Sequence, residues 1–352
     1  MWESYYYHTL FIVVLLSVLI LLRPTNRSQL VPSPDNKFTW IIILGIVYML
    51  AYTPIPIGTG ADREYYVRSF IAIQDGYKPS DISDPLFYYW QSITGKIMDY
   101  KQWLIVTAFL YVCNYFIVAK RVTTRYTFVM MLMFVSAFSF RSYGVNTMRA
   151  GIAATFILLG ITSMRSLWQC LFLWIGVMFH FSMIIPAIAF VITKFYDKTR
   201  LFFVLWLLAV PISAIAGGFF EQIFSAFGDV DNRAMEYLIG DSENSYRTGF
   251  RIDFILYSCT PMLLGYYYIY KQGFNDKRYK QLYNTYILAN IFWVLVIRAS
   301  YSDRFAYLSW ILYPILLIYP LLQQRLLPKQ NEKIALILLL QEGFTYFMFL
   351  KG

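Results

Sequence analysis

Long apolar runs recur from one end of the chain to the other, and they constrain the fold more than any other feature of the sequence. Each run covers roughly 15 to 22 residues, close to the length of about 20 that an α-helix needs to cross a membrane. Only 14% of the residues are charged, whereas a soluble domain carries about 25%. Because a spanning segment must satisfy its own backbone, the runs predict α-helices rather than a barrel. The chain is therefore expected to be an all-α, polytopic integral membrane protein.

Lysine and arginine collect in the short segments between the apolar runs, and their placement predicts the topology. Basic residues favour the cytoplasmic side, so the loops at residues 23–37, 120–125 and 271–280 are expected there. The net charge of +10 follows from these helix ends and does not indicate a nucleic-acid partner. The runs amount to about eleven spans, roughly 10 to 12. Residues 334–350 are expected to form either a further span or a helix at the membrane surface.

Two long polar segments, residues 57–100 and 218–250, are expected on the extracytoplasmic side of the membrane. In the first, Asp84 and Pro85 predict the start of an amphipathic helix, because proline is favoured at the first helical position. No stretch has the length and polarity of a soluble domain. Residues 1–352 are therefore predicted to form a single polytopic membrane domain.

The most unusual stretch runs from Ser139 to Ile161, where two arginines bracket a short polar turn between apolar helices. Arg141 and Arg149 are predicted at the outer face, where basic residues are disfavoured. A charge near the membrane is expensive unless it is paired or functional, and a guanidinium binds phosphate oxygens bidentately. The stretch therefore indicates an anion site. The alternative is a pair of helix-end arginines whose charged heads extend to the interface.

Further charged clusters are expected on the same face as Arg141 and Arg149. Several of these clusters use only arginine as the cation, whereas lysine dominates several inner loops, and this bias favours one shared pocket for a phosphate-bearing ligand. The alternative is that these residues pair with one another or cap helices. They are Asp62 with Arg63, Arg247 with Arg251 and Asp253, and Arg298 with Asp303 and Arg304.

His180 lies in an apolar segment, residues 167–193, that is short for two ordinary spans. A hairpin of two short helices bent near His180 keeps the basic residues on both sides of the segment in the cytoplasm. His180 and Asp62 are alternative general bases, since imidazole titrates near neutral pH. The structural alternatives are a hydrogen-bonded bend for His180 and an ion pair or helix cap for Asp62. The three cysteines lie in apolar runs without metal-ligand spacing, so no metal or cofactor is expected.

Aromatic side chains make up 20% of the chain, more than belts at the two membrane interfaces require. Part of this set is expected to line a cavity, because sugars stack on aromatic faces. Packing of bulky aromatic side chains between helices is the alternative explanation.

Five short motifs, taken in order, resemble those of one protein family. They are GADREYY (Gly60–Tyr66), DPLFYYW (Asp84–Trp90), SFRSYGVNTMRAGIA (Ser139–Ala153), FHFSMIIP (Phe179–Pro186) and YSDRFAYL (Tyr301–Leu308). Their order and spacing resemble those of the EpsG-like, Wzy-type polysaccharide polymerases, and the resemblance extends over about residues 45–325.

The resemblance implies a multi-pass glycosyltransferase of the bacterial inner membrane, GT-C-like in fold, with its active site facing the periplasm or the exterior. Such enzymes join oligosaccharide units carried on undecaprenyl pyrophosphate. They transfer the growing chain from its lipid carrier to the non-reducing end of an incoming unit. The implied partners are this lipid-linked donor and acceptor, membrane lipid and a chain-length regulator protein. No metal or other cofactor is implied.

The resemblance also implies a role for each candidate residue. Arg141 and Arg149 would hold the donor pyrophosphate and stabilise it as it leaves. His180 or Asp62 would deprotonate the attacking sugar hydroxyl, with Arg141 assisting catalysis through the leaving group. The remaining pyrophosphate contacts would be Arg247, Arg251, Arg298 and Arg304, and the sugar contacts Arg63, Tyr65, Tyr66, Trp90, Tyr143, Asn146 and Asp303.

Other classes of protein remain as alternatives. A lipid-linked oligosaccharide flippase also needs cations for pyrophosphate, but these should line a path through the membrane rather than gather at one face. An O-antigen ligase differs from a polymerase in its acceptor. A membrane acyltransferase is expected to pair histidine with an acid on a cytoplasm-facing helix, and a purely structural protein needs no site.

Overall fold

The computed structural model describes residues 2–23, 30, 36–59, 61–79, 82–226, 249–299 and 302–351. These residues form helices and connecting loops, and no strand occurs among them, which confirms the all-α prediction. Five helical segments of the described residues are long and apolar enough to cross a membrane. They are Trp2–Leu21, Tyr100–Val122, Thr199–Ala216, Ser302–Gln323 and Gln330–Lys351.

A bent pair of helices, Thr127–Val135 and Phe138–Val145, makes a sixth candidate span if the two count as one. Four apolar helices of 10–17 residues are shorter, namely Phe38–Ala51, Met148–Ile161, Ser166–Phe179 and Phe181–Phe195. The molecule is therefore a polytopic α-helical membrane protein, and the count of about eleven spans stays a prediction.

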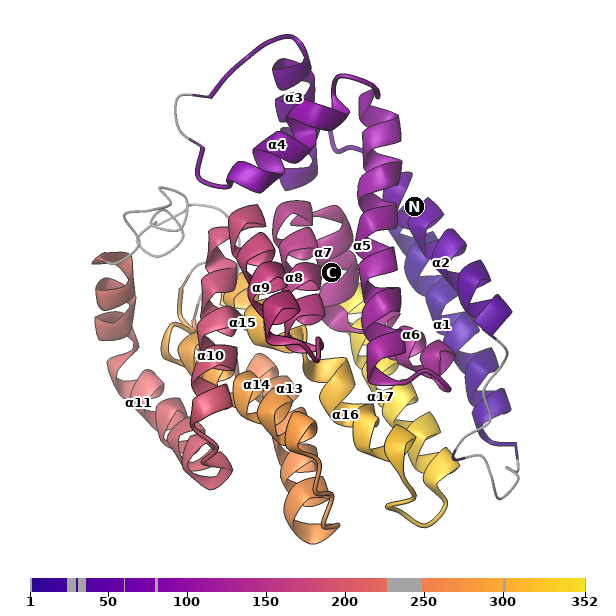
Figure 1. Ribbon diagram of the computed structural model, residues 1–352, viewed down its shortest axis with the longest axis vertical. Helices are drawn as coiled ribbons and strands as arrows, with labels where there is room; N and C mark the ends of the chain where they lie inside the picture. The colour runs from indigo at the N-terminus through magenta and orange to yellow at the C-terminus, as the bar shows by residue number, and fades with distance from the viewer. Residues whose placement is uncertain are drawn as a thin grey trace. The chain divides into compact units, whose positions relative to one another are not determined.

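The chain divides into two compact units. Unit 1 comprises Met1–Met183 and Leu317–Gly352, and unit 2 comprises Ile184–Leu316. The helices of unit 1 are α1 (Trp2–Leu21), α2 (Asn36–Ala51), α3 (Asp62–Gln74), α4 (Pro85–Thr94), α5 (Tyr100–Val122), α6 (Thr127–Val135), α7 (Phe138–Val145), α8 (Met148–Ile161), α9 (Ser166–Phe179), the 3₁₀ turn η1 (Phe181–Met183) and α17 (Gln330–Lys351). Those of unit 2 are α10 (Ile184–Phe195), α11 (Thr199–Ala226), α13 (Ile252–Tyr266), the π-helical turn η2 (Tyr267–Lys271), α14 (Lys277–Leu295) and α15 (Ser302–Trp310), and α16 (Tyr313–Gln323) runs across the boundary (Figure 1).

Small residues let the helices of unit 1 approach closely around α8. A Cβ on Gly151 would overlap the backbone carbonyl of Tyr143, so only glycine fits where α7 turns back onto α8. A Cβ on Gly176 of α9 would lie 3.0 Å from the carbonyl oxygen of Ala153 on α8. Close approach at small residues is the usual way for helices to pack in a membrane, and here it fixes the start of α8 and the end of α9.

The chain bends by 73° between α6 and α7, and the C-terminal helix α17 satisfies the backbone at this break. Thr345 donates to the carbonyl of Ser136 at 2.8 Å, and the Gln341 amide donates to the carbonyl of Met133. Carbonyls released at a helix break need partners where water is excluded. The polar residues that interrupt the apolar C-terminal run therefore support a continuous helix, and α17 is one of the five spanning candidates.

The first polar segment folds into two short helices, α3 and α4, that lie together at one end of α5 (Figure 1). Helix α4 begins at Pro85 directly after Asp84, as the sequence predicts. The Gln91 amide of α4 donates to the carbonyl of Tyr66 on α3 at 3.0 Å, and the Trp90 indole donates to Thr107 of α5 at 3.1 Å. These bonds fix the two short helices against each other and against α5.

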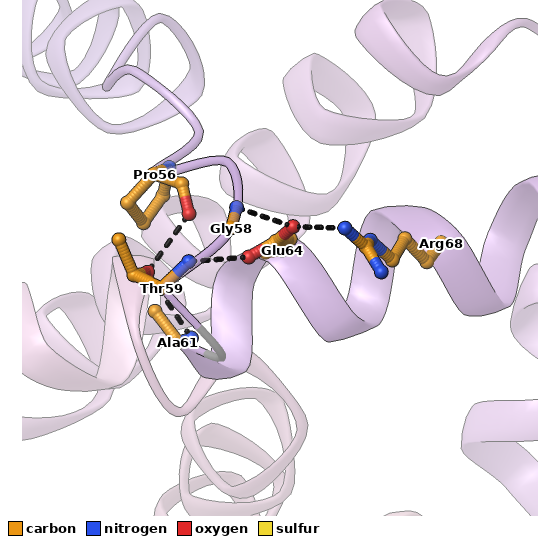
Figure 2. A network of polar contacts seen from close by, with 6 residues as sticks. All are labelled: Pro56, Gly58, Thr59, Ala61, Glu64 and Arg68. Atoms are coloured by element: carbon orange, nitrogen blue, oxygen red, sulfur yellow. Dashed lines mark hydrogen bonds and ion pairs between the residues drawn. The ribbon is translucent and has the colours of Figure 1, made fainter.

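Glu64 holds the loop that leads into α3. Its carboxylate accepts hydrogen bonds from the backbone N–H of Gly58 at 2.8 Å and of Thr59 at 3.2 Å, and it pairs with Arg68 at 2.5 Å (Figure 2). Gly58 has φ +78°, a left-handed conformation that glycine adopts without a steric penalty. The side chains of α3 are therefore positioned by a fixed loop.

Unit 2 is built around α14, which contacts α10, α11, α13 and α15. Its buried Asn290 accepts a hydrogen bond from the Trp206 indole at 2.7 Å and donates to Ser258 at 3.2 Å and to Ser309 at 2.8 Å. This satisfied polar network joins α11, α13 and α15 to α14. Of the second polar segment, residues 227–248 lie outside the described residues.

The predicted break at His180 is confirmed. Helix α9 ends at Phe179, His180 has extended backbone angles (φ −159°, ψ 119°), and η1 follows directly. The reversal of direction that the hairpin requires stays a prediction.

Candidate functional site

Two side chains and one backbone N–H from separate parts of the chain meet around one buried carboxylate in unit 1. The carboxylate of Asp84 lies 2.7 Å from the guanidinium of Arg149 and 3.1 Å from Nδ1 of His180. Its other oxygen accepts the backbone N–H of Phe181 at 3.0 Å. We call Asp84, Arg149 and His180 the Asp84 cluster. It brings together two of the residues that the sequence singles out, His180 and Arg149.

Local structure explains how the cluster forms. Asp84 occupies the N-cap position of α4, where an aspartate usually bonds the first N–H groups of its own helix, yet its side chain makes no capping bond. Both of its oxygens instead contact residues far away in the sequence. Arg149 lies in the first turn of α8, and His180 follows the last residue of α9. Because α8 and α9 pack closely, Arg149 and His180 can both reach Asp84.

The charge of Asp84 is stabilised despite its burial. Its side chain is only 3% exposed, and burial by itself raises the pKa of a carboxyl group. The hydrogen bond and charge of His180, the charge of Arg149 and the N–H of Phe181 outweigh this effect, so the pKa of Asp84 lies below its usual value. The cluster therefore holds an ionised carboxylate at neutral pH.

A pocket opens beside the cluster, with a cavity volume of about 160 Å³. Asp84 and Arg149 form part of its wall, and the rest comes from α3, α4 and the loop between them. Aromatic side chains and polar groups alternate around it: Tyr65, Tyr66, Tyr77, Phe87 and Tyr88, with Ser69, Ser83 and Gln91. Rings for stacking next to hydroxyl, amide and ionic groups suit a carbohydrate, whose faces are apolar and whose edges carry hydroxyls.

The sequence did not single out Asp84 as a functional residue. It was predicted to start a helix, a role that accounts for an aspartate before a proline without further chemistry. The signal that could have found it is its place in the DPLFYYW motif, within the same polar segment as Asp62 and the tyrosines. Its partners lie 65 and 96 residues later in the chain, so only the fold identifies them.

Arg141 has a different carboxylate partner from Arg149. Its Nη1 lies 2.5 Å from Glu3 of α1, and its guanidinium lies over the rings of Tyr6 and Tyr7, 5.7 and 5.4 Å from their centroids. Arg63 of α3 interacts electrostatically with Arg141 and donates to the carbonyl of Ala51 at 2.8 Å. We call Arg63 and Arg141 the Arg63–Arg141 pair. The two arginines that bracket the predicted turn thus belong to two different groups of residues.

The other predicted residues of unit 1 have varied surroundings. Tyr65 and Tyr66 line the pocket, as a sugar-binding role requires. Trp90 is held by Thr107 and is absent from the pocket lining. Asp62 is the first residue of α3 and is half-buried. Within α7 and the turn that follows it, Tyr143 is buried and Asn146 is exposed, and neither is among the residues lining the pocket.

The remaining predicted arginines belong to unit 2. Arg251 makes a two-pronged ion pair with Asp253, at 2.9 and 2.8 Å, and Arg298 donates to the carbonyl of Ala214 at 2.6 Å. Asp303 and Arg304 lie in the first turn of α15. Arg247 lies outside the described residues. A pocket that these residues share with Arg149 stays a prediction. Among the residues that the structure describes, no three histidine, cysteine or acidic side chains are grouped to hold a metal ion.

These observations define a polytopic α-helical membrane protein with a buried Asp–Arg–His cluster beside an aromatic pocket. The model of the EpsG family matches residues 36–351, and the chain belongs to this family. Membership identifies a membrane protein of polysaccharide biosynthesis, in a family associated with glycosyltransferase-like polymerase activity. It confirms the resemblance of the five motifs. No protein of curated function and no solved structure matched the chain.

Proposed function

We propose that this protein is a polysaccharide polymerase that joins undecaprenyl-pyrophosphate-linked oligosaccharide units at the outer face of the bacterial inner membrane. The family supports this proposal. The observation that carries it is the Asp84 cluster beside the aromatic pocket, whose wall includes Asp84 and Arg149, because cluster and pocket together combine a base, a cation and sugar-binding surfaces. About eleven spans, a GT-C-like fold and a partner that regulates chain length are parts of the same proposal.

The reaction is a displacement at a sugar carbon. A hydroxyl at the non-reducing end of the acceptor attacks the anomeric carbon of the donor chain, and a new C–O bond forms. The bond between that carbon and the pyrophosphate oxygen breaks, and undecaprenyl pyrophosphate leaves with the electron pair. The hydroxyl proton passes to a base on the protein. The proton released by the hydroxyl and the negative charge that develops on the leaving pyrophosphate each require a protein group that is already in position.

His180 is the base in this proposal. Its Nδ1 lies 3.1 Å from Asp84, and a carboxylate that accepts the proton on Nδ1 leaves Nε2 as the proton acceptor of the ring. Asp84 then stabilises the imidazolium formed when Nε2 takes the hydroxyl proton. Asp62, the alternative base, lies at the start of α3, and neither Asp62 nor His180 is among the residues lining the pocket. His180, however, is held in a defined orientation by Asp84, which does line it. The geometry therefore favours His180.

Arg149 is the cation that binds the leaving pyrophosphate. Its side chain is 17% exposed, and it borders the pocket in which the aromatic rings would hold the sugar. Asp84 contacts both Arg149 and His180, so one carboxylate fixes the base and the leaving-group cation in a constant relative position. Such preorganisation stabilises charge that develops in the transition state.

The test is to incubate the purified protein with its lipid-linked repeat unit, without added nucleotide or metal, and to separate the products on a gel. A ladder of lengthening glycans is expected, and His180→Gln should reduce its rate by a factor of about 10² to 10⁴, the usual contribution of a general base. Gln281→Leu, a change on α14 of unit 2, serves as the matched control. Movement of the lipid across liposomes without a ladder would identify a flippase and contradict the proposal.

A further inference from the structure

Arg63 and Arg141 are both buried in unit 1, and their positive charges act on each other. Arg63 is 2% exposed and Arg141 7% exposed, and they come from α3 and α7. Burial, with a further contribution from the charge of Arg141, lowers the pKa of Arg63 to about 10. Two like charges in a buried position are unfavourable unless negative charge compensates for them.

The described neighbours supply little of that compensation. Arg63 contacts only neutral acceptors, the carbonyl of Ala51 at 2.8 Å and the sulfur of Met148 at 4.0 Å. Arg141 is paired with Glu3, the one carboxylate at the pair, whose side chain is 53% exposed. Glu342 is fully buried on α17 and makes no ion pair with either arginine. Among the described residues, one partly solvated carboxylate pairs with Arg141, and Arg63 has only neutral acceptors.

Both guanidinium groups also keep an unused hydrogen-bond donor. The Nε atoms of Arg63 and Arg141 are shielded from solvent and have no acceptor. A buried donor without a partner costs about 1–3 kcal/mol, and more when the group is charged. Proteins keep such donors where a ligand supplies the acceptor, and guanidinium groups match the oxygens of phosphate.

We infer that the Arg63–Arg141 pair is a second anion site, separate from the Asp84 cluster, which binds a phosphate or pyrophosphate group in exchange with the carboxylate of Glu3. The inference rests on the proposed polymerase function for the identity of that group. Polymerisation brings two lipid-linked units together. The donor loses its pyrophosphate at the reaction centre, whereas the acceptor reacts at its far end and keeps its own. The acceptor pyrophosphate therefore needs a site without catalytic groups.

Glu3 occupies this site as a stand-in for one phosphate oxygen. It lies in the first turn of α1, and its exposure lets solvent and ions reach it. Tyr6 and Tyr7 of the same helix lie against the guanidinium of Arg141 and hold it in place when Glu3 moves away. This assignment moves Arg141 from the donor pyrophosphate to that of the acceptor.

The first test measures binding of inorganic pyrophosphate to the purified full chain in detergent by titration calorimetry. Glu3→Gln removes the competing carboxylate and should tighten binding about tenfold, within the usual range of coupling between competing groups. Glu332→Gln is the matched control, because it removes the same charge from a residue that pairs with Lys329. Equal affinities of the Glu3 and Glu332 variants would overturn the inference.

A second variant tests the arginine itself. Arg63→Lys keeps the buried charge but loses the planar fork, so in the Glu3→Gln background it should weaken pyrophosphate binding about tenfold while the protein stays folded. Unchanged affinity in a folded protein would exclude Arg63 from the site. The glycan ladder separates the two proposals. If pyrophosphate binding depends on Glu3 but no ladder forms, the anion site is supported and the polymerase function is contradicted. If a ladder forms but Glu3→Gln does not change pyrophosphate binding, the polymerase function is supported and the anion site is contradicted.

Discussion

Asp84 and Glu3 each pair with an arginine of unit 1, and their surroundings differ in almost every other respect. Asp84 is 3% exposed and bridges α4, α8 and the residues after α9 through three contacts. Glu3 is 53% exposed and contacts one of two neighbouring arginines. The carboxylate of Asp84 is enclosed by the groups that it contacts. The carboxylate of Glu3 is open to solvent and contacts only one of the two arginines near it. The ion pair of Asp84 with arginine therefore stabilises the fold, whereas the ion pair of Glu3 with arginine is one that a ligand can replace.

Asp84→Asn is expected to have the largest effect, because it removes the negative charge of a buried carboxylate that pairs with Arg149 and His180. Loss of one partner from such a pair costs about 3–5 kcal/mol of unfolding free energy. Thermal unfolding in detergent, followed by tryptophan fluorescence, measures it. Asp75→Asn, on an exposed residue, is the control. If Asp84→Asn lowers the free energy of unfolding no more than Asp75→Asn does, then Asp84 is not the structural carboxylate that the comparison with Glu3 requires.

The pH dependence of stability sharpens the same comparison. Because the pKa of Asp84 in the folded protein lies below the unfolded value of about 3.9, its contribution is fully present above that pH and is lost as the pH falls through the folded pKa. The wild-type protein should therefore lose its advantage over Asp84→Asn in acid. The difference between their unfolding temperatures should be largest near neutral pH. A difference that stays constant down to strongly acidic pH would contradict this account.

Gly151→Ala acts on the Asp84 cluster through the backbone. The added methyl group would overlap the carbonyl of Tyr143 and push the start of α8, with Arg149, away from Asp84. Overpacking of this kind costs about 1–3 kcal/mol, and the rate of glycan extension should fall with it. Gly45→Ala, whose methyl group meets no atom within 4 Å, is the control. Equal rates and stabilities for the two variants would rule out this coupling.

Gln341→Leu tests how α7, which carries Arg141, is held. Its loss leaves the carbonyl of Met133 without the donor that it has at the helix break, at a cost of about 1–3 kcal/mol. Pyrophosphate binding should weaken as well, because α7 positions Arg141. Gln281→Leu removes a longer contact of 3.5 Å to a carbonyl in unit 2 and should have a smaller effect on both.

Glu3→Gln is expected to have the smallest effect on stability. Glu3 is 53% exposed, so solvent screens its charge. Its loss should therefore lower the unfolding temperature less than Asp84→Asn does, while pyrophosphate affinity rises. A loss of stability as large as that of Asp84→Asn would show that Glu3 is a structural partner and not a replaceable one.

The sequence could predict features that depend on neighbouring residues. The apolar runs predicted helices, Asp84 and Pro85 predicted where α4 begins, and the polar interruption near His180 predicted where α9 ends. It could not predict the pairing of charges. Asp84 and Arg149 are 65 positions apart and Glu3 and Arg141 are 138 apart, and no periodicity specifies contacts over such distances. Arg141 and Arg149, only eight positions apart in the sequence, were therefore assigned to one site.

Helix α17 donates hydrogen bonds to the backbone carbonyls at the break between α6 and α7, and this has a consequence for the order in which the helices assemble. Helix α17 belongs to unit 1 but follows all of unit 2 in the sequence, so it is synthesised after unit 2. Until Gln341 and Thr345 arrive, the carbonyls of Met133 and Ser136 lack the donors that they have in the finished fold. We therefore expect the segment that carries Arg141 to take its final position only after unit 2 and α17 have been synthesised. Protease protection of this segment in chains released after Gln323, compared with the full chain, measures that dependence.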